Sequence, residues 1–361
     1  MSSKIIEKAL RGEFALIAEL GVNFMDFTER LGLTPIEAAK DMVKKAAQAG
    51  VHCVKFQAYR PESIVLRDTP VYWETNGGPL TQYESLKEIG NLALDEFAEI
   101  ARYCESLGVE FLVTPFCTQS TDYLDPFVQC YKTASADLTN HPLISHIAKK
   151  KKPVIMSTGA SSIEEIKEAV SVIRAYNSSP LVLMHCVLEY PATEDHANLR
   201  KITALRREFP ELIIGYSDHV IPDKDYTVLK TAYALGAVLI EKHYTYDKTI
   251  PENDHEHAMD PDDAKKIIAQ ISRMESILGS SELIPIHCEA EARTHARRSI
   301  VSAVHIDKGS VITREMLDFK RPGTGLSPAL VEEIVGMTAV CNIPDDTVLT
   351  HDMLVFANLI I

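Results

Sequence analysis

Short apolar runs rich in β-branched residues alternate with longer amphipathic segments over roughly the first 280 residues. Buried parallel strands have this near-continuous apolar pattern, because helices cover the sheet that they form. The eight runs are FALIAEL from Phe14, VHCVKFQ from Val51, VEFLVTP from Val109, VQCYKTAS from Val128, PVIMSTG from Pro153, PLVLMHC from Pro180, LIIGYSD from Leu212 and AVLIEKH from Ala237. Helix-like segments between them include 35–49, 95–107, 162–176 and 261–278, several of which open on a Thr, Asp or Ser cap.

Eight strand–helix units over about 250 residues have the size and rhythm of a TIM barrel. An open doubly wound sheet is the alternative, but no GxGxxG follows the first run to support it. The pattern therefore predicts an α/β chain whose residues 1–280 form a TIM (β/α)8 barrel.

The rhythm breaks after Leu278. Residues 281–297 are polar and irregular, and we expect them to be a linker. In 298–361 the short strand-like pieces SIVSAVHI, SVIT, TAVCNI and TVLT alternate with Gly and Pro turns, which predicts a small β-rich domain. A domain of this size is near the lower limit for folding alone, so we expect it to lean on a partner surface.

A long insertion, residues 60–94, follows the second predicted strand. It contains the only tryptophan, Trp73, and the turn-like sequence NGGP. Long insertions in barrels are usually functional, so we expect a lid or a substrate loop here.

The balance of charge narrows the range of partners. Lys and Arg total 37 against 51 Asp and Glu, a formal charge of −14, which disfavours a nonspecific nucleic-acid binder and a polybasic membrane-surface protein. The start, MSSKIIEKALRGEF, does not resemble a secretory signal and no apolar stretch is long enough to cross a bilayer, so we expect a cytoplasmic protein. The seven cysteines are scattered, and Cys53, Cys130 and Cys186 lie in apolar runs, as expected for reduced core thiols.

Polar residues close most of the predicted strands, and reacting groups in a TIM barrel lie at those carboxyl ends. Each of these residues alone would more often be a satisfied structural group, but their gathering at one mouth indicates a site. They are Glu19, Lys55, Gln57, Thr114, Lys132, Ser135, Ser157, Tyr190, Ser217, His219, Glu241 and His243.

Lys55 and Lys132 lie within apolar strand sequence, where an unpaired ammonium group is costly to bury. Together with the hydroxyls of Ser135 and Ser157 they favour a pocket for a phosphate and a carboxylate. The alternative is a Schiff base on Lys132, as in aldolases of this fold.

His219 and His243 end adjacent predicted strands, a geometry that suits a divalent metal with open coordination positions. His255 and His257 are two residues apart in an apparent loop, and we interpret them as loop or lid residues rather than ligands. Asp254 beside them can hold a substrate hydroxyl.

Eight motifs in order, AELGVNF, VKFQ, VTPF, YKTASAD, STG, HCVLEYP, YSDH and EKHYT, resemble the sialic acid synthase (N-acetylneuraminate synthase) family. The sequence KRPGTG at 320–325 resembles that family's C-terminal antifreeze-like (SAF) domain. Eight ordered matches are specific at the level of the family.

The resemblance implies a transferase that condenses phosphoenolpyruvate with N-acetylmannosamine or a related amino sugar, using manganese or magnesium, in a domain-swapped homodimer. The product would be a nine-carbon acid of the neuraminate, legionaminate or pseudaminate type, plus phosphate. By motif, the residues that hold phosphoenolpyruvate would be Lys55, Lys132, Ser135, Ser157 and Ser217, the metal ligands His219 and His243, and the residues facing the sugar Glu19, Gln57, Tyr190 and Asp254, with Thr114 a further substrate contact. Arg321 would reach the partner's sugar site, and Glu19, Glu241, Lys55 and Lys132 would act in catalysis, Glu241 in an orienting or acid–base role.

Two positions depart from the family pattern. Phe24 follows Asn23 where many members have His, and Val187 and Leu188 follow the HC of the sixth run where many have Thr and a polar residue. Leu188 suits a less hydroxylated sugar, so a 6-deoxy diacetamido substrate stays open. The rival functions are a Schiff-base lyase using Lys132 and a noncatalytic carbohydrate-binding protein, and the second leaves the polar strand ends unexplained.

Overall fold

The computed structural model describes residues 2–73, 81–251 and 253–356. The NGGP sequence of the predicted insertion lies outside the described residues. The chain forms two compact units, Met1–Gly279 and Ser280–Ile361, which are described separately below.

Eight parallel strands form the first unit, in the spatial order β3-β2-β1-β8-β7-β6-β5-β4. Their bounds are β1 Ala15–Gly21, β2 Cys53–Ala58, β3 Glu110–Pro115, β4 Tyr131–Thr133, β5 Val154–Ser157, β6 Leu181–Cys186, β7 Ile213–Asp218 and β8 Leu239–His243. The first and last strands of this order, β3 and β4, lie next to each other, so the sheet is a nearly closed barrel. The predicted TIM barrel is confirmed, each of the eight apolar runs overlaps one strand, and the open doubly wound alternative is wrong.

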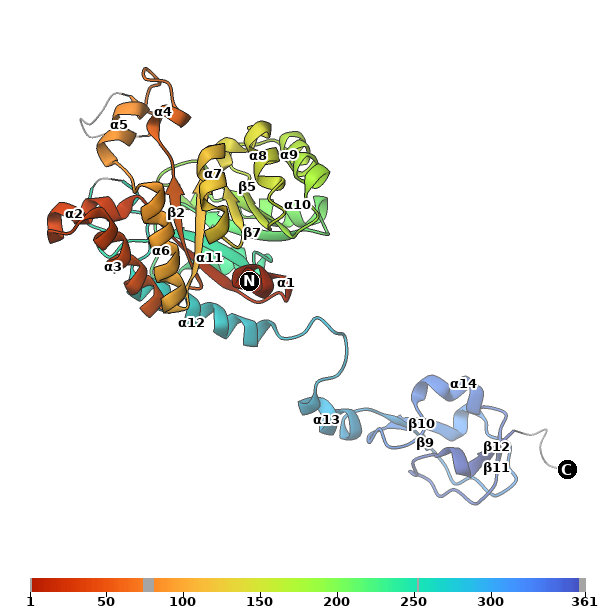
Figure 1. Ribbon diagram of the computed structural model, residues 1–361. Helices are drawn as coiled ribbons and strands as arrows, with labels where there is room; N and C mark the ends of the chain where they lie inside the picture. Colours follow the sequence, from red (N-terminus) through yellow and green to blue (C-terminus); the bar gives the residue numbers. More distant parts are fainter. Residues whose placement is uncertain (1, 74–80, 252, 357–361) are drawn as a thin grey trace. The chain divides into compact units, whose positions relative to one another are not determined.

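Helices surround the barrel (Figure 1). Their bounds are α1 Lys4–Leu10, α2 Asp26–Leu31, α3 Pro35–Gln48, α4 Pro61–Ile64, α5 Gln82–Ile89, α6 Leu94–Leu107, α7 Thr118–Leu124, α8 His141–Ala148, α9 Ile163–Tyr176, α10 Arg200–Glu208, α11 Thr227–Ala234 and α12 Pro261–Leu278. The expected caps are present: the hydroxyl of Ser162 accepts from the Glu165 N–H, and the Glu165 carboxylate accepts from the Ser162 N–H.

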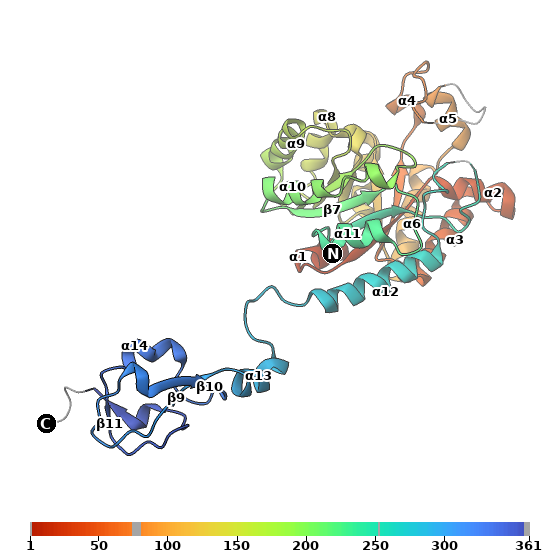
Figure 2. The ribbon, with the colours of Figure 1, turned by 180° about the vertical axis from the view of Figure 1, so that it is seen from behind.

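The insertion at 60–94 contains α4 and α5, which the apolar pattern did not predict. The two short helices stand together at one end of the barrel, whereas α1 lies at the other end (Figures 1 and 2). Both helices are brief, α4 with four residues and α5 with eight, so their sequences hold too few turns for a periodic signal.

The barrel interior has an apolar lower layer and a polar upper layer. Alternate residues of a strand face the same side of the sheet, so Ile17 and Glu19 of β1 both point inward, one layer apart. The lower layer joins Ile17 to the other strands' buried apolar residues, and Ile5 and Ile6 of α1 pack against it from below. The polar upper layer therefore lies on an apolar layer that excludes water.

On the outer side of the same strands, Asp218 of β7 and Lys242 of β8 form a buried ion pair of 2.5 Å between Oδ2 and Nζ. Their side chains are 2% and 0% exposed. The Tyr216 hydroxyl donates to Asp218, and Lys242 also donates to the carbonyl of Val220. The pair ties the two strands that end in the predicted metal ligands.

The second unit has two small antiparallel sheets around its own core of aliphatic residues. Its elements are α13 Ala290–His295, β9 Ser299–Ser302, β10 Leu317–Lys320, α14 Val331–Ile334, β11 Thr338–Ala339 and β12 Leu354–Val355. SVIT and TVLT contribute only single bridges, at Val311 and Val348, and the segment predicted as an irregular linker contains α13. The β-rich character that the sequence predicted is confirmed, although β10 and β12 were missed.

In the part of the chain that the structure describes, every helix is too short or too polar to cross a membrane. The cytoplasmic location stays a prediction.

The buried pair predicts an asymmetric effect on stability. Asp218→Ala leaves the Lys242 ammonium buried without its carboxylate, so the free energy of unfolding should fall by about 3–5 kcal/mol. Urea unfolding of the full chain, followed by circular dichroism, measures it. The control is Asp122→Ala, which removes an ion pair to Lys150 from a side chain that is 53% exposed and should cost less than about 1 kcal/mol. Equal losses in the two variants would contradict the argument.

Candidate active site

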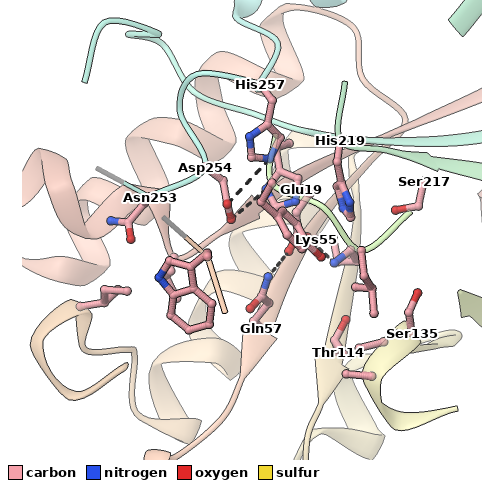
Figure 3. Close-up of a pocket in the computed structure, with 18 of the residues that line it drawn as sticks. Glu19, Lys55, Gln57, Thr114, Ser135, Ser217, His219, Asn253, Asp254 and His257 are labelled. Atoms are coloured by element: carbon pink, nitrogen blue, oxygen red, sulfur yellow. Dashed lines mark hydrogen bonds and ion pairs between the residues drawn. The ribbon is translucent and has the colours of Figure 1, made fainter. Parts of the chain in front are cut away.

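A cavity of about 680 Å³ opens at the carboxyl ends of the barrel strands. Figure 3 shows side chains from opposite sides of the barrel converging on it. The structure brings together every barrel residue that the sequence singled out, and the lining includes Glu19, Lys55, Gln57, Thr114, Lys132, Ser135, Ser157, Tyr190, Ser217, His219, Glu241, His243 and Asp254. Trp73 and residues of α5 also line it, which places the insertion at the mouth as the lid hypothesis requires.

Four buried charges of alternating sign cross the floor of the cavity. Lys55 Nζ lies 2.5 Å from Glu19 Oε2 and 3.5 Å from Glu241 Oε1, and Lys132 Nζ lies 3.9 Å from Glu241 Oε2. Each of these side chains is 6% exposed or less. The strand register explains the pairing: Glu19 of β1 is directly opposite Lys55 of β2.

Burial and the neighbouring charges shift the pKa values of the two glutamates in opposite directions, and they do the same for the two lysines. Burial raises the pKa of Glu19, more than Lys55 lowers it. Burial would also raise the pKa of Glu241, but Lys132 and Lys55 outweigh it and the pKa falls. For Lys55 the two carboxylates outweigh burial and raise the pKa, whereas for Lys132 burial prevails and lowers it. The site thus holds one carboxyl that keeps a proton more readily and one that stays ionised.

Hydroxyls and backbone groups crowd the Lys132 side. Lys132 Nζ donates to Ser157 Oγ at 2.6 Å and to the Thr133 carbonyl at 3.1 Å. The Gly159 N–H donates to Ser135 Oγ at 2.9 Å, and a Cβ on Gly159 would stand 2.9 Å from that oxygen. A side chain at this position would crowd Ser135, so Gly159 lets the backbone orient the Ser135 hydroxyl, and hydroxyls beside a lysine are groups that can hold a phosphate or carboxylate.

Glu19 and Glu241 have further donors. Gln57 Nε2 donates to Glu19 Oε1 at 2.7 Å, and Ser217 Oγ donates to Glu241 Oε1 at 3.0 Å. Both carboxylates are therefore oriented by a neutral side chain from the adjacent strand.

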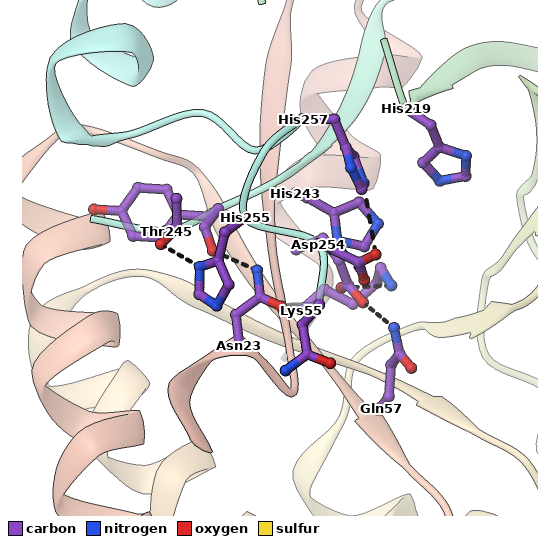
Figure 4. A network of polar contacts seen from close by, with 12 residues as sticks. Asn23, Lys55, Gln57, His219, His243, Thr245, Asp254, His255 and His257 are labelled. Atoms are coloured by element: carbon purple, nitrogen blue, oxygen red, sulfur yellow. Dashed lines mark hydrogen bonds and ion pairs between the residues drawn. The ribbon is translucent and has the colours of Figure 1, made fainter. Parts of the chain in front are cut away.

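Three imidazoles that line the cavity, those of His219, His243 and His257, stand close together (Figure 4). His219 Nδ1 donates to the Val187 carbonyl at 2.6 Å, so that in the neutral ring Nε2 carries the lone pair. The ring centroids of His219 and His243 are 5.4 Å apart, so the convergence expected of the two strand ends is present. The ring centroid of His257 is 4.9 Å from that of His243.

A tighter group for a cation consists of His243, Asp254 and His257, whose ligand atoms all lie within 4.8 Å of one another. His243 Nδ1 and His257 Nε2 are buried and have no hydrogen-bond partner, although both face Asp254. Burial, with the neighbouring imidazoles, lowers the pKa of both histidines well below the usual value, so both rings are neutral and can act as ligands. The residues present therefore fit a divalent metal.

His257 is the residue whose position differs most from the expectation. It lies in a loop as predicted, but it is 2% exposed and lines the cavity beside His243. The N–H of Met259 donates to the His243 carbonyl, which folds the loop back along the end of β8. His255, two residues earlier, pairs with Asp26 and is not among the lining residues, so the sequence spacing gave no sign of which histidine lines the cavity.

Arg321 lies just after β10 in the second unit and is exposed. Its proposed role in a partner's site stays a prediction.

Two lysines, two glutamates and a histidine–aspartate cluster at the mouth of a TIM barrel define an enzyme that acts on an anionic small molecule with a bound metal. The comparisons with known proteins narrow this class.

The profile of the NeuB family matches residues 42–283, and that of the SAF domain matches residues 297–355. The N,N'-diacetyllegionaminic acid synthase of Legionella pneumophila is 36% identical over 342 residues, 92% of each chain. The synthase of the same name from Campylobacter jejuni is 30% identical over 337 residues, 92% of this chain and 97% of that one. The crystal structure of N-acetylneuraminic acid synthetase from Leptospira borgpetersenii, in complex with citrate, is 32% identical, covers 78% of this chain and 90% of that one, and superposes with a TM-score of 0.67.

The chain belongs to the NeuB family and carries a C-terminal SAF domain. The resemblance seen in the eight ordered motifs and in KRPGTG is thereby confirmed.

The lowered pKa of Lys132 predicts how the binding of an anion depends on pH. An ammonium group binds phosphate only while it is protonated, and burial lowers the pKa of Lys132 below its usual 10.5. The binding constant for inorganic phosphate, measured by calorimetry, should therefore fall as the pH rises through a value below 10.5. In Lys132→Met, binding should be weak throughout and this alkaline loss should disappear. A wild-type constant that stays flat up to the usual lysine pKa would contradict the assignment.

Proposed function

We propose that this protein is a metal-dependent synthase that condenses phosphoenolpyruvate with an open-chain amino sugar to give a nine-carbon sialic acid and phosphate. The single observation that carries the proposal is the pair of buried lysines, Lys55 and Lys132, at the floor of a cavity lined by hydroxyls and imidazoles. The names of the 30–36% identical relatives support the same reaction class.

Charge balance explains why a cation belongs here. The cavity lining carries more carboxyl groups, among them Glu19, Glu241 and Asp254, than ammonium groups, which are those of Lys55 and Lys132, so it is negative before any substrate enters. Phosphoenolpyruvate adds further negative charge in a dry site, where uncompensated charge is costly. A divalent ion and a protonated Glu19 offset that charge.

The anionic substrate is expected to lie between Lys55 and Lys132. Ser135, Ser157 and Ser217 would donate to its phosphate and carboxylate oxygens, with Thr114 at the edge. Each ammonium group would exchange part of its contact with Glu19 or Glu241 for the substrate.

His219 and His243 would hold the metal, manganese or magnesium. When bound, the ion acts as a Lewis acid on the sugar aldehyde.

The protein's own residues would manage the protons. The methylene carbon of phosphoenolpyruvate attacks the aldehyde carbon, and the aldehyde oxygen becomes a hydroxyl. Glu19, whose pKa is raised, is the group that can supply the proton. Water then adds to the former enol carbon, and Glu241, whose pKa is lowered and which Ser217 orients, takes a proton from it. The resulting hemiketal phosphate loses phosphate by breaking its carbon–oxygen bond, which leaves the α-keto acid.

A Schiff base on Lys132 fits this geometry less well. Its Nζ donates to Ser157 and to the Thr133 carbonyl and faces Glu241, so it is engaged as a hydrogen-bond donor. A covalent amine has to be free to attack a carbonyl carbon.

The sugar pocket is partly apolar. Leu188, Tyr72 and Trp73 line the cavity, and Gln57, Tyr190 and Asp254 supply polar contacts. A 6-deoxy sugar with two acetamido groups presents a methyl group and fewer hydroxyls than N-acetylmannosamine, and it matches this lining better. The two relatives named as diacetyllegionaminic acid synthases support that choice.

An assay of phosphate release tests the reaction and the sugar together. With phosphoenolpyruvate and manganese, we expect turnover with a 2,4-diacetamido-2,4,6-trideoxy hexose and a kcat/KM at least about tenfold lower with N-acetylmannosamine, because unmatched hydroxyls would face Leu188. Lys55→Met and Lys132→Met should each lose about two or more orders of magnitude, since each removes a charged partner of the anion. Absence of phosphate release with every open-chain amino sugar would refute the proposal, and wild-type kinetics in the lysine variants would refute the anion pocket.

Complementation tests whether Arg321 serves the partner's site in a swapped homodimer. Arg321→Ala and His243→Ala should each be nearly inactive. In a mixed dimer one site combines the intact barrel of the first variant with the intact second unit of the other. Co-expression at equal levels should restore roughly a quarter of all sites under random pairing. Doubly tagged mixed dimers with only parental activity would rule out the swapped arrangement.

A further inference from the structure

We propose that His257 is a metal ligand in this protein and that Asp254 and His257 join His243, one of the two histidines expected to hold the divalent cation. This inference rests on the proposed function only for the role of the ion in catalysis. It assigns Asp254 to the metal instead of the sugar, and it adds His257, from the loop between β8 and α12, as a ligand.

The distances fit three ligands of one ion. His243 Nδ1 lies 3.3 Å from Asp254 Oδ2, and His257 Nε2 lies 3.7 Å from Asp254 Oδ1. Neighbouring ligand atoms that each stand about 2.1 Å from a metal are about 3–3.5 Å apart in octahedral or tetrahedral sites. Small side-chain rotations are enough to bring the three groups around a common centre.

His243 Nδ1 and His257 Nε2 have no hydrogen-bond partner among the described residues. Both are buried, and both face the same carboxylate. Leaving a buried polar atom unpaired is costly, so such atoms aimed at one point indicate something that binds there. A cation satisfies both nitrogens and neutralises Asp254 in one step.

The loop that carries His257 is fixed on both sides of it. After it, the Met259 N–H donates to the His243 carbonyl at 2.8 Å, and the Thr245 N–H donates to the Met259 carbonyl at 3.0 Å. Before it, His255 is held by Asp26 Oδ2 at 2.9 Å and by Thr245 Oγ1 at 2.8 Å, as Figure 4 shows in part. The position of His257 is therefore set before any ion binds, as a metal ligand requires.

Fixed partners also distinguish the two loop histidines. Both nitrogens of His255 have hydrogen-bond partners, so its ring anchors the loop to α2 through Asp26. His257 has only the carboxylate of Asp254 near its Nε2. The first is a positioning residue, and the second is available to an ion.

The ligand types predict which metal is preferred. Imidazole nitrogens suit Mn²⁺, Co²⁺ and Zn²⁺, whereas Mg²⁺ is held mainly by oxygen atoms and water. Two imidazoles with one carboxylate, or three with His219, should favour Mn²⁺ over Mg²⁺ by binding and not only by activity.

Metal titration of the full-length protein tests the inference. Free Mn²⁺ is measured by electron paramagnetic resonance for the wild type, His257→Ala and the control Glu256→Ala, which removes an exposed charge from the same loop. We expect His257→Ala to raise the Kd for Mn²⁺ at least about tenfold, since even residues that only orient a ligand have effects of that size. Glu256→Ala should change it by less than about threefold, because a single exposed charge acts weakly through water. Thermal unfolding in chelator shows whether each variant is folded.

A second variant gives a positive signal. In His257→Cys loaded with Co²⁺, a thiolate bound to the metal produces a near-ultraviolet charge-transfer band that nitrogen and oxygen ligands do not produce. Glu256→Cys is the control, and wild-type protein corrects for Cys186, which lies close to His219. A new band in His257→Cys alone supports the proposal.

The outcomes separate this inference from the proposed function. Wild-type Mn²⁺ affinity in a folded His257→Ala, together with no new band in His257→Cys, would overturn the ligand role even if phosphate release is normal. Conversely, suppose that the wild type releases no phosphate with any sugar while His257→Ala still loses Mn²⁺ affinity. That result would uphold the metal site and refute the synthase reaction.

Discussion

The alternation of charge among Glu19, Lys55, Glu241 and Lys132 is the constraint on which the rest of the site depends. Each group is buried, and a lone buried charge would be neutralised by a shift of its pKa. Because opposite charges stand side by side, both ammonium groups can be held within the barrel. Any ligand that enters must keep this balance, so an anion between the lysines and a cation beside the carboxylates belong together.

The two layers of the barrel interior are what make these charges effective. The apolar layer and α1 below them exclude water, which strengthens every electrostatic contact above. The cost is that each buried polar group needs a hydrogen-bond partner: Gln57 and Ser217 donate to the two glutamates, and Ser157 accepts from Lys132. Inward-facing residues recur at every second position of a strand, and they form both the apolar layer that stabilises the barrel and the charged layer above it.

The loops lie over the buried charges, and under the proposed function they would determine the choice of ligand. The barrel floor of lysines and glutamates suits an anionic substrate in general, whereas the insertion with Trp73 and the loop with Asp254 and His257 stand over it. Under the proposed function, a change in these loops would alter the sugar or the metal without disturbing the buried charges. This separation is consistent with relatives whose names specify different acids on one scaffold.

The sequence by itself determined the barrel, its eight strands and the strand-end residues, because buried strands must be apolar and their inward positions recur every second residue. The twelve residues at or just past the strand ends needed no knowledge of long-range contacts to be named, whereas Asp254 lies in the loop after β8. Only the tertiary structure decided which loop histidine enters the cavity and which groups are paired. His257 faces His243 because Met259 bonds back to the end of β8 and Asp26 anchors His255. Such contacts produce no periodic pattern in the sequence. The orientation of side chains in this loop therefore could not be predicted without the tertiary structure.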